Sequence, residues 1–98
     1  MIYDTIAPCK KKKGYEGIPD EFYQIPLKKV KETLLKELHS YEVLRETKVM
    51  VVFKEEKSGN KISIYPSLRT FIHGDVEEDE AIVILDKISK SIEKIKAS

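Results

Sequence analysis

One block of sequence, residues 61–96, constrains the fold of this chain more than any other part. It reads KISIYPSLRTFIHGDVEEDEAIVILDKISKSIEKIK. Ile62 and Ile64 alternate with polar residues, which is the pattern of a half-buried strand. A proline-containing turn leads into a second apolar segment, residues 69–73, and Gly74 ends it. The block therefore predicts a strand, a turn, a second strand and a long helix, in that order.

The helix at the end of this block is predicted by its charges and by its apolar stripe. Asp75 and Glu78 have the spacing of a capping box. Acidic residues crowd the predicted start of the helix and lysines its end, and both arrangements favour the helix dipole. The stripe expected to face the core consists of Ala81, Leu85, Ile88, Ile92 and Ile95.

The middle of the chain adds a second helix and two more strands. Pro26 suits a helix start, and apolar residues continue at helical spacing to Leu38. Residues 41–46 and 48–54 are predicted strands, the second of them supported by its β-branched side chains. The Ser-Gly-Asn sequence at 58–60 is a hairpin turn signal.

Residues 1–24 are the least regular part of the chain. Glycines and prolines interrupt them, so we expect an irregular segment or an edge strand there. Residues 25–98 form the α-β-β-β-β-α body of a single domain that spans residues 1–98. The predicted fold class is α+β in the order (β)-α-β-β-β-β-α. A curved antiparallel sheet of four to five strands carries both helices on one face.

The sheet face away from the helices is the candidate functional surface. Alternation places five apolar or aromatic side chains on it: Met50, Val52, Tyr65, Phe71 and His73. Such a face is too apolar to meet solvent alone, so we expect it to meet a partner, a second copy of the chain or the N-terminal segment. The leading hypothesis is therefore a small, non-enzymatic protein-interaction or self-association module. Its partner is another protein or a second copy of the chain.

Three segments resemble one repeat of the TATA-box-binding protein family. They are residues 49–54 (VMVVFK), 62–74 (ISIYPSLRTFIHG) and 76–81 (VEEDEA), and the likeness runs from Tyr41 onward. The resemblance implies a concave sheet that enters the DNA minor groove and wedges aromatic side chains between base steps. Tyr65 matches one of these wedge positions.

The match to that family is partial at the residues that carry DNA binding. Phe71 and His73 match groove-contacting positions, and Lys54 matches a phosphate-contacting one. Lys48 stands where the other wedge phenylalanine of the repeat is expected, and Leu68 replaces a turn glycine. The chain has length for one repeat where the family has two, so a homodimer is needed to complete the saddle-shaped surface.

Nucleic-acid binding by a fold of this type is the alternative hypothesis. The phosphate contacts would come from Lys10, Lys11, Lys12, Lys13, Lys48, Lys54, Lys61 and Arg69. The net charge of the whole chain is +1, because the acidic residues nearly balance the basic ones. This balance argues against a general attraction to polyanions.

A thiol-based carrier or enzyme that uses Cys9 is the third hypothesis. The lysines that follow Cys9 predict a lowered thiol pKa and a more reactive thiolate. Neither His39 nor His73 stands at a spacing that marks it as a base for this thiol, and His39 suits a structural role at a helix end. The sequence shows no cluster of metal ligands and no catalytic motif. We therefore predict no enzyme activity, cofactor, metal or small-molecule substrate.

Composition bounds the class of protein and its compartment. Hydrophobic residues make up 41% of the chain and charged residues 36%, which is compatible with a packed core. A single cysteine cannot form an intramolecular disulfide, which favours a reducing compartment. The apolar runs are far too short to span a bilayer, and no signal-peptide pattern is present. These features predict a cytoplasmic protein, with a Lys, Glu and Ile bias typical of heat-adapted microbes.

Overall fold

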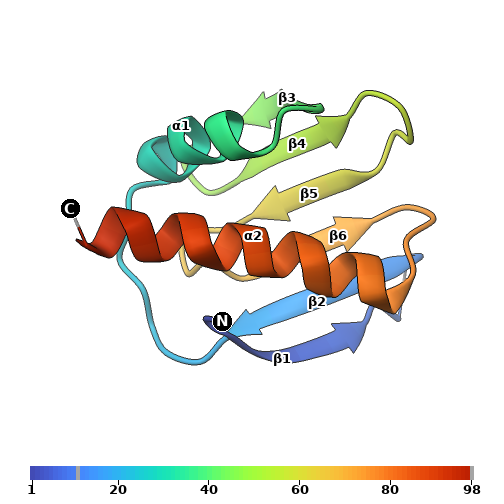
Figure 1. The fold of residues 1–98 in the computed structure, drawn as a ribbon, viewed down its shortest axis with the longest axis horizontal. Coiled ribbons are helices and arrows are strands. Elements are labelled where there is room, and N and C mark those ends of the chain that lie inside the picture. The colour runs from blue at the N-terminus through green and yellow to red at the C-terminus, as the bar shows by residue number, and fades with distance from the viewer. Residues whose placement is uncertain (11, 98) are drawn as a thin grey trace.

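Six strands and two helices are formed by residues 1–10 and 12–97, the part of the chain that the computed structural model describes. In chain order they are β1 (Tyr3–Pro8), β2 (Gly14–Pro19), α1 (Leu27–Glu37), β3 (Tyr41–Glu46), β4 (Val51–Glu55), β5 (Lys61–Ile64), β6 (Thr70–His73) and α2 (Glu78–Ala97). The strands form one antiparallel sheet in the order β1-β2-β6-β5-β4-β3. Both helices lie on the same face of this sheet (Figure 1).

The predicted α+β class is therefore confirmed, with six strands in place of four to five. Strand β3 has the predicted bounds, and Gly59 takes a left-handed φ of 75° in the predicted hairpin turn. Ile62 and Ile64 are fully buried, as their alternation predicted. Neither helix within the described residues has the length and hydropathy that a bilayer crossing needs.

The additional strand comes from the N-terminal segment, which is more regular than we predicted. Residues 1–24 contain the hairpin β1–β2, in which β1 is an edge strand and β2 pairs with β6. Gly17, interpreted as a breaker, lies inside β2 instead. A Cβ at this position would lie 2.9 Å from side-chain atoms of Leu85 and of Tyr3. The glycine therefore lets α2 and the Tyr3 ring approach the strand closely.

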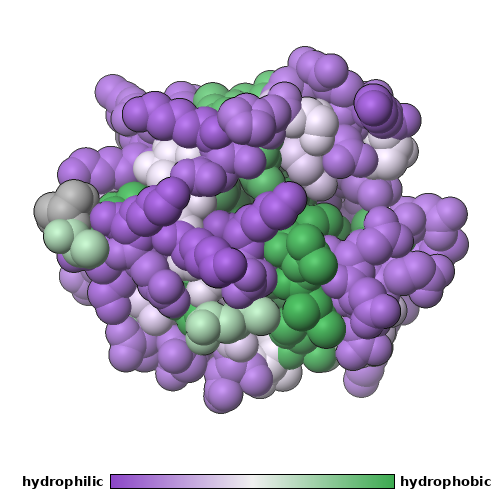
Figure 2. All heavy atoms as spheres, viewed as in Figure 1, coloured by the Kyte–Doolittle hydropathy of each residue, from purple (hydrophilic) through white to green (hydrophobic). Residues whose placement is uncertain are grey.

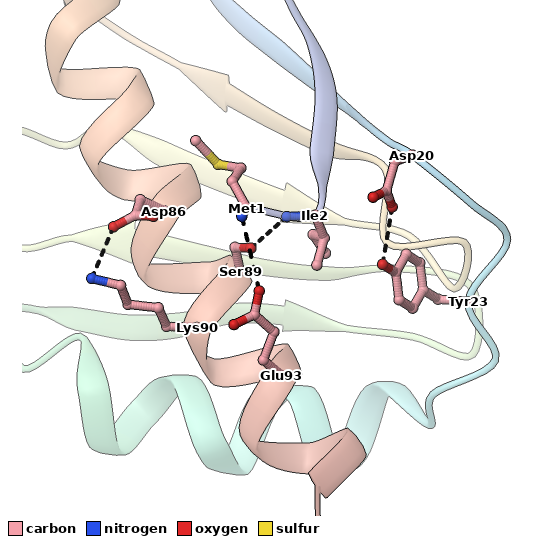
Figure 3. A network of polar contacts seen from close by, with 8 residues as sticks. All are labelled: Met1, Ile2, Asp20, Tyr23, Asp86, Ser89, Lys90 and Glu93. Atoms are coloured by element: carbon pink, nitrogen blue, oxygen red, sulfur yellow. Dashed lines mark hydrogen bonds and ion pairs between the residues drawn. The ribbon is translucent and has the colours of Figure 1, made fainter.

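Polar contacts hold the hairpin against the rest of the domain. The Ile2 backbone N–H donates to Ser89 Oγ on α2 at 2.6 Å (Figure 3). The Tyr3 hydroxyl reaches Thr70 Oγ1 on β6, also at 2.6 Å, and both side chains are buried. Burial raises the Tyr3 pKa well above its ordinary range, so the hydroxyl stays neutral. These bonds link the hairpin to α2 and to β6.

Two predicted element starts are wrong, and local hydrogen bonds explain both. Strand β4 begins at Val51 because Thr47 forms a turn, with its N–H donating to the Met50 carbonyl at 2.8 Å. The capping pair of α2 is also displaced. Asp75 instead forms an ion pair with Lys13 Nζ at 2.7 Å. The Glu77 backbone N–H donates to Glu80 Oε1 at 3.3 Å, and the helix begins at Glu78.

The core lies between the helices and the sheet. Its largest fully buried side chains include Leu34 from α1, Leu85, Ile88 and Ile92 from α2, and Val51, Phe53, Ile62, Ile64 and Ile72 from the strands. Leu68 belongs to the same core although it lies in the turn between β5 and β6. Its φ of 71° is left-handed, a conformation that costs roughly 1–2 kcal/mol for a residue with a Cβ.

The left-handed φ of Leu68 can be tested by replacing it with alanine and with glycine. Glycine normally destabilises a protein more than alanine does, and at Leu68 we expect the reverse. Leu68→Ala should lower the free energy of unfolding by about 3 kcal/mol, because a buried side chain is lost while the backbone strain remains. Leu68→Gly should be less harmful than Leu68→Ala by about 1 kcal/mol, because glycine takes a positive φ freely. The measurement is urea unfolding followed by circular dichroism.

The matched control is Leu85, which is equally buried but lies inside α2. There Leu85→Gly should be worse than Leu85→Ala by about 1 kcal/mol, the ordinary helix preference. If glycine were worse than alanine at both positions, the strain at Leu68 would be refuted.

Candidate functional site

The sheet face away from the helices is hollowed into an open groove of about 1110 Å³. Its lining comes from the strands and from the loops next to them: Ala7, Pro8, Cys9, Lys10, Lys12, Glu16, Leu44, Arg45, Met50, Val52, Lys61, Ser63, Tyr65, Arg69, Phe71 and His73. The opposite, helix-bearing side is mostly hydrophilic, with a hydrophobic strip over the first half of α2 (Figure 2). This groove is the candidate site.

Strand register explains why these residues share a surface. One row of paired residues crosses the sheet from edge to edge: Ala7, Glu16, Phe71, Ser63, Val52 and Arg45. Beside it runs a second row of Gly14, His73, Lys61, Lys54 and Glu42. Directly opposed residues in antiparallel strands point to the same face. The floor of the groove is thus set by backbone pairing.

Three aromatic rings stand next to one another in the groove. The centroids of Tyr65 and Phe71 are 5.7 Å apart with an interplanar angle of 78°, which is an edge-to-face contact. Phe71 and His73 are also 5.7 Å apart, at 27° and therefore stacked. The guanidinium carbon of Arg69 lies 5.4 Å from the Phe71 centroid. Together these groups form a row of planar surfaces, the aromatic row, in the middle of the groove.

All five residues predicted to bind a partner line the groove. Met50, Val52, Tyr65, Phe71 and His73 come together there, and Val52 is buried in the floor while the three rings are half-exposed. The five residues therefore lie on one continuous surface.

The predicted phosphate-contacting residues are more scattered. Lys10, Lys12, Lys61 and Arg69 line the groove. Lys13 instead pairs with Asp75, and Lys48 lies in the turn before β4. Lys54 pairs with Lys61 in register but is not part of the lining, and Lys11 lies outside the described residues.

Sequence reasoning missed two charged residues of the groove, Arg45 and Glu16. Arg45 reaches the site because β3 shifts its register between Val43 and Arg45. Nothing in the sequence signals that irregularity. Glu16 was missed because its segment was not predicted as a strand. With these additions, five basic residues and one acidic residue line the groove among those described. The charge of the groove is therefore strongly positive although the net charge of the chain is +1.

Cys9 and His73 meet at one end of the groove, a pairing that the sequence spacing did not indicate. The Cys9 Sγ lies 3.8 Å from His73 Nε2. Burial, and secondly the negative charge of Glu16, raises the pKa of the Cys9 thiol, contrary to the lowering predicted from the lysine run. Burial, followed by Lys12 and Lys61, lowers the pKa of His73. At neutral pH the contact therefore joins an uncharged thiol to an uncharged imidazole.

This pair does not extend to a metal site. Across residues 1–10 and 12–97 there is no group of three or more His, Cys, Asp or Glu side chains placed to hold a metal ion. The chemical resources of the groove are therefore a basic lining, a row of planar groups and one carboxylate.

Comparisons with known proteins add no relative to this description. No protein-family model, no curated protein and no solved structure matches the chain. The resemblance to the TATA-box-binding protein family stays a prediction from the sequence.

The raised thiol pKa can be tested by alkylation. The rate of Cys9 reaction with iodoacetamide should rise with pH through a midpoint above that of a free cysteine. Glu16→Gln should move the midpoint down, because it removes a negative charge that opposes thiolate formation. Glu56→Gln, in the hairpin between β4 and β5, removes the same charge away from the groove and should leave it unchanged. A wild-type midpoint at or below that of free cysteine would contradict this assignment.

Proposed function

We propose that this protein is a non-enzymatic binding module whose groove holds single-stranded nucleic acid. The observation that carries the proposal is the combination, on one concave surface, of five basic residues and the aromatic row. Phosphates would be attracted by Lys10, Lys12, Lys61 and Arg45, while Arg69 forms an ion pair with Glu16. Unpaired bases would stack on the planar groups between them.

Charge favours this ligand over a second copy of the chain, one of the two partners that the sequence analysis predicted. Acidic and basic residues nearly balance over the whole chain, which argued against polyanion binding. Among the described residues that line the groove, however, the basic ones outnumber the acidic one. Acidic residues concentrate elsewhere, as at the start of α2, where Glu78, Asp79 and Glu80 form the first turn. A second copy docking groove to groove would bring two basic linings together, and like charges across an interface cost several kcal/mol. An anionic ligand avoids that cost.

Single strands fit the groove better than duplex DNA. The family resemblance implies paired aromatic wedges in a minor groove, but Lys48 occupies the second wedge position and lies outside the lining. The rings of Tyr65, Phe71 and His73 instead gather in one cluster on β6 and at the residue that follows β5. Stacking platforms of this kind bind bases that are already unpaired.

The direct test is fluorescence anisotropy with a labelled eight-nucleotide single strand of mixed sequence at low salt. We expect binding that weakens as salt rises, because bound phosphates release counterions. Phe71→Ala should weaken binding about tenfold, the usual loss for one stacked base. Lys61→Ala should weaken binding and reduce the slope of log K against log salt by about 1.

Two control variants remove a ring and a positive charge that lie outside the groove. Phe22→Ala removes a ring that is 75% exposed and lies outside the groove. Lys87→Ala removes one positive charge from α2. Neither should change the affinity by more than about twofold. Absence of binding at low salt would refute the proposal. A stable dimer that Phe71→Glu dissociates, measured by light scattering, would favour self-association instead.

A further inference from the structure

Glu16 is an unexpected residue in the groove, since it is the one carboxylate among the described lining residues. A fixed negative charge beside a bound phosphate backbone lowers the affinity for every oligonucleotide alike. The side chain is also largely covered, with 16% of its surface exposed. A covered carboxylate in a polyanion-binding groove therefore needs a function that offsets its repulsion.

Resting on the proposed function, we propose that Glu16 and Arg69 together read the edge of one stacked base and make the groove prefer cytosine to uracil. The ligand class is thus a single strand in which one position carries a base with an exocyclic amino group next to a ring acceptor. Glu16 supplies the acceptor and Arg69 the donor.

The geometry of the pair leaves both groups able to contact a ligand. Arg69 Nε and Nη2 both contact Glu16 Oε2, so these contacts leave the other carboxylate oxygen, Oε1, to a ligand. Arg69 is 52% exposed, and its remaining N–H groups can donate further hydrogen bonds. An acceptor and a donor are therefore held side by side.

The same pair is fixed next to the stacking platform. Glu16 is the direct register partner of Phe71, and the Arg69 guanidinium carbon lies 5.4 Å from the Phe71 ring centroid. Bases stack on aromatic rings such as that of Phe71. A base that stacks on the Phe71 ring beside the Arg69 guanidinium therefore places one edge next to both Glu16 and the guanidinium N–H groups.

Cytosine and uracil differ at that edge because cytosine presents a hydrogen-bond donor where uracil presents an acceptor. An ionised carboxylate can bind only the donor. The N4 amino group of cytosine donates to Oε1, while its N3 accepts from the guanidinium. In the position on the Phe71 ring that cytosine takes, uracil presents the O4 carbonyl, an acceptor, to the carboxylate, and presents its N3–H donor to the guanidinium. Both contacts are then mismatched, and unpaired polar groups in a covered site are costly.

A purely structural role for Glu16, in which it only holds Arg69 over Phe71, makes a different prediction. Glutamine at position 16 keeps an oxygen that can accept a hydrogen bond from Arg69, so the Arg69 side chain stays in place. Its amide N–H₂ can also donate to the uracil O4, which a carboxylate cannot do. Glu16→Gln should therefore abolish discrimination if Glu16 reads the base, and preserve the relative affinities if it only positions Arg69.

The experiment compares labelled C8 and U8 ribonucleotides, at pH 7.5 and low salt, on wild-type protein and two variants. Wild type should bind C8 about tenfold more tightly than U8. Glu16→Gln should bind both with similar affinity, mainly by gaining affinity for U8. Glu56→Gln, which makes the same charge change in the hairpin between β4 and β5, should keep the tenfold ratio.

The possible results separate base reading by Glu16 from single-strand binding by the groove. Equal affinities of wild type for C8 and U8, or a ratio that persists in Glu16→Gln, would overturn base reading by Glu16 while leaving single-strand binding intact. Binding of neither oligonucleotide would overturn the proposed function and this inference together. Circular dichroism of Glu16→Gln, expected to match wild type, confirms that a lost ratio does not reflect misfolding.

Discussion

Burial of two helical stripes on one side of a single sheet is the constraint on which the structure depends. Leu85, Ile88 and Ile92 of α2 pack with the inward-facing residues of the central strands. These three side chains are fully buried. Their burial is the main source of stability available to a domain of this size. Because side chains alternate along a strand, using one face for the core assigns every intervening residue to the other face. The groove is therefore a direct consequence of the core.

The N-terminal hairpin brings further charged and thiol side chains onto that face. Strand β2 inserts beside β6, and this pairing brings Glu16 opposite Phe71 and Gly14 opposite His73. Cys9 reaches His73 through the same arrangement. The glycines make this placement possible: a Cβ at Gly14 would lie 1.9 Å from the Ile72 carbonyl oxygen, and Gly14 has a φ of 146°. Four of the seven charged or thiol side chains that line the groove among the described residues thus come from the segment with the weakest secondary-structure signal.

The sequence predicted the body of the domain well because its signals are local. Alternation at Ile62 and Ile64, the turn at Gly59 and the stripe of α2 each depend on neighbours only a few residues away. The five predicted face residues gathered for the same reason. The N-terminal hairpin was not predictable in this way, because Gly17 is tolerated in β2 only through its distant contact with Leu85. The contact of Cys9 with His73 and the register shift before Arg45 likewise depend on pairing between remote segments.

The most direct measurement of the central claim is an NMR titration of the ¹⁵N-labelled protein with an eight-nucleotide single strand. The account predicts that amide shifts change along the groove, at Glu16, Lys61, Phe71 and His73, while amides on the exposed side of α2 stay in place. Changes confined to the helix side would contradict it, as would a spectrum that does not respond at low salt. Either result would show that the basic groove is not a nucleic-acid surface.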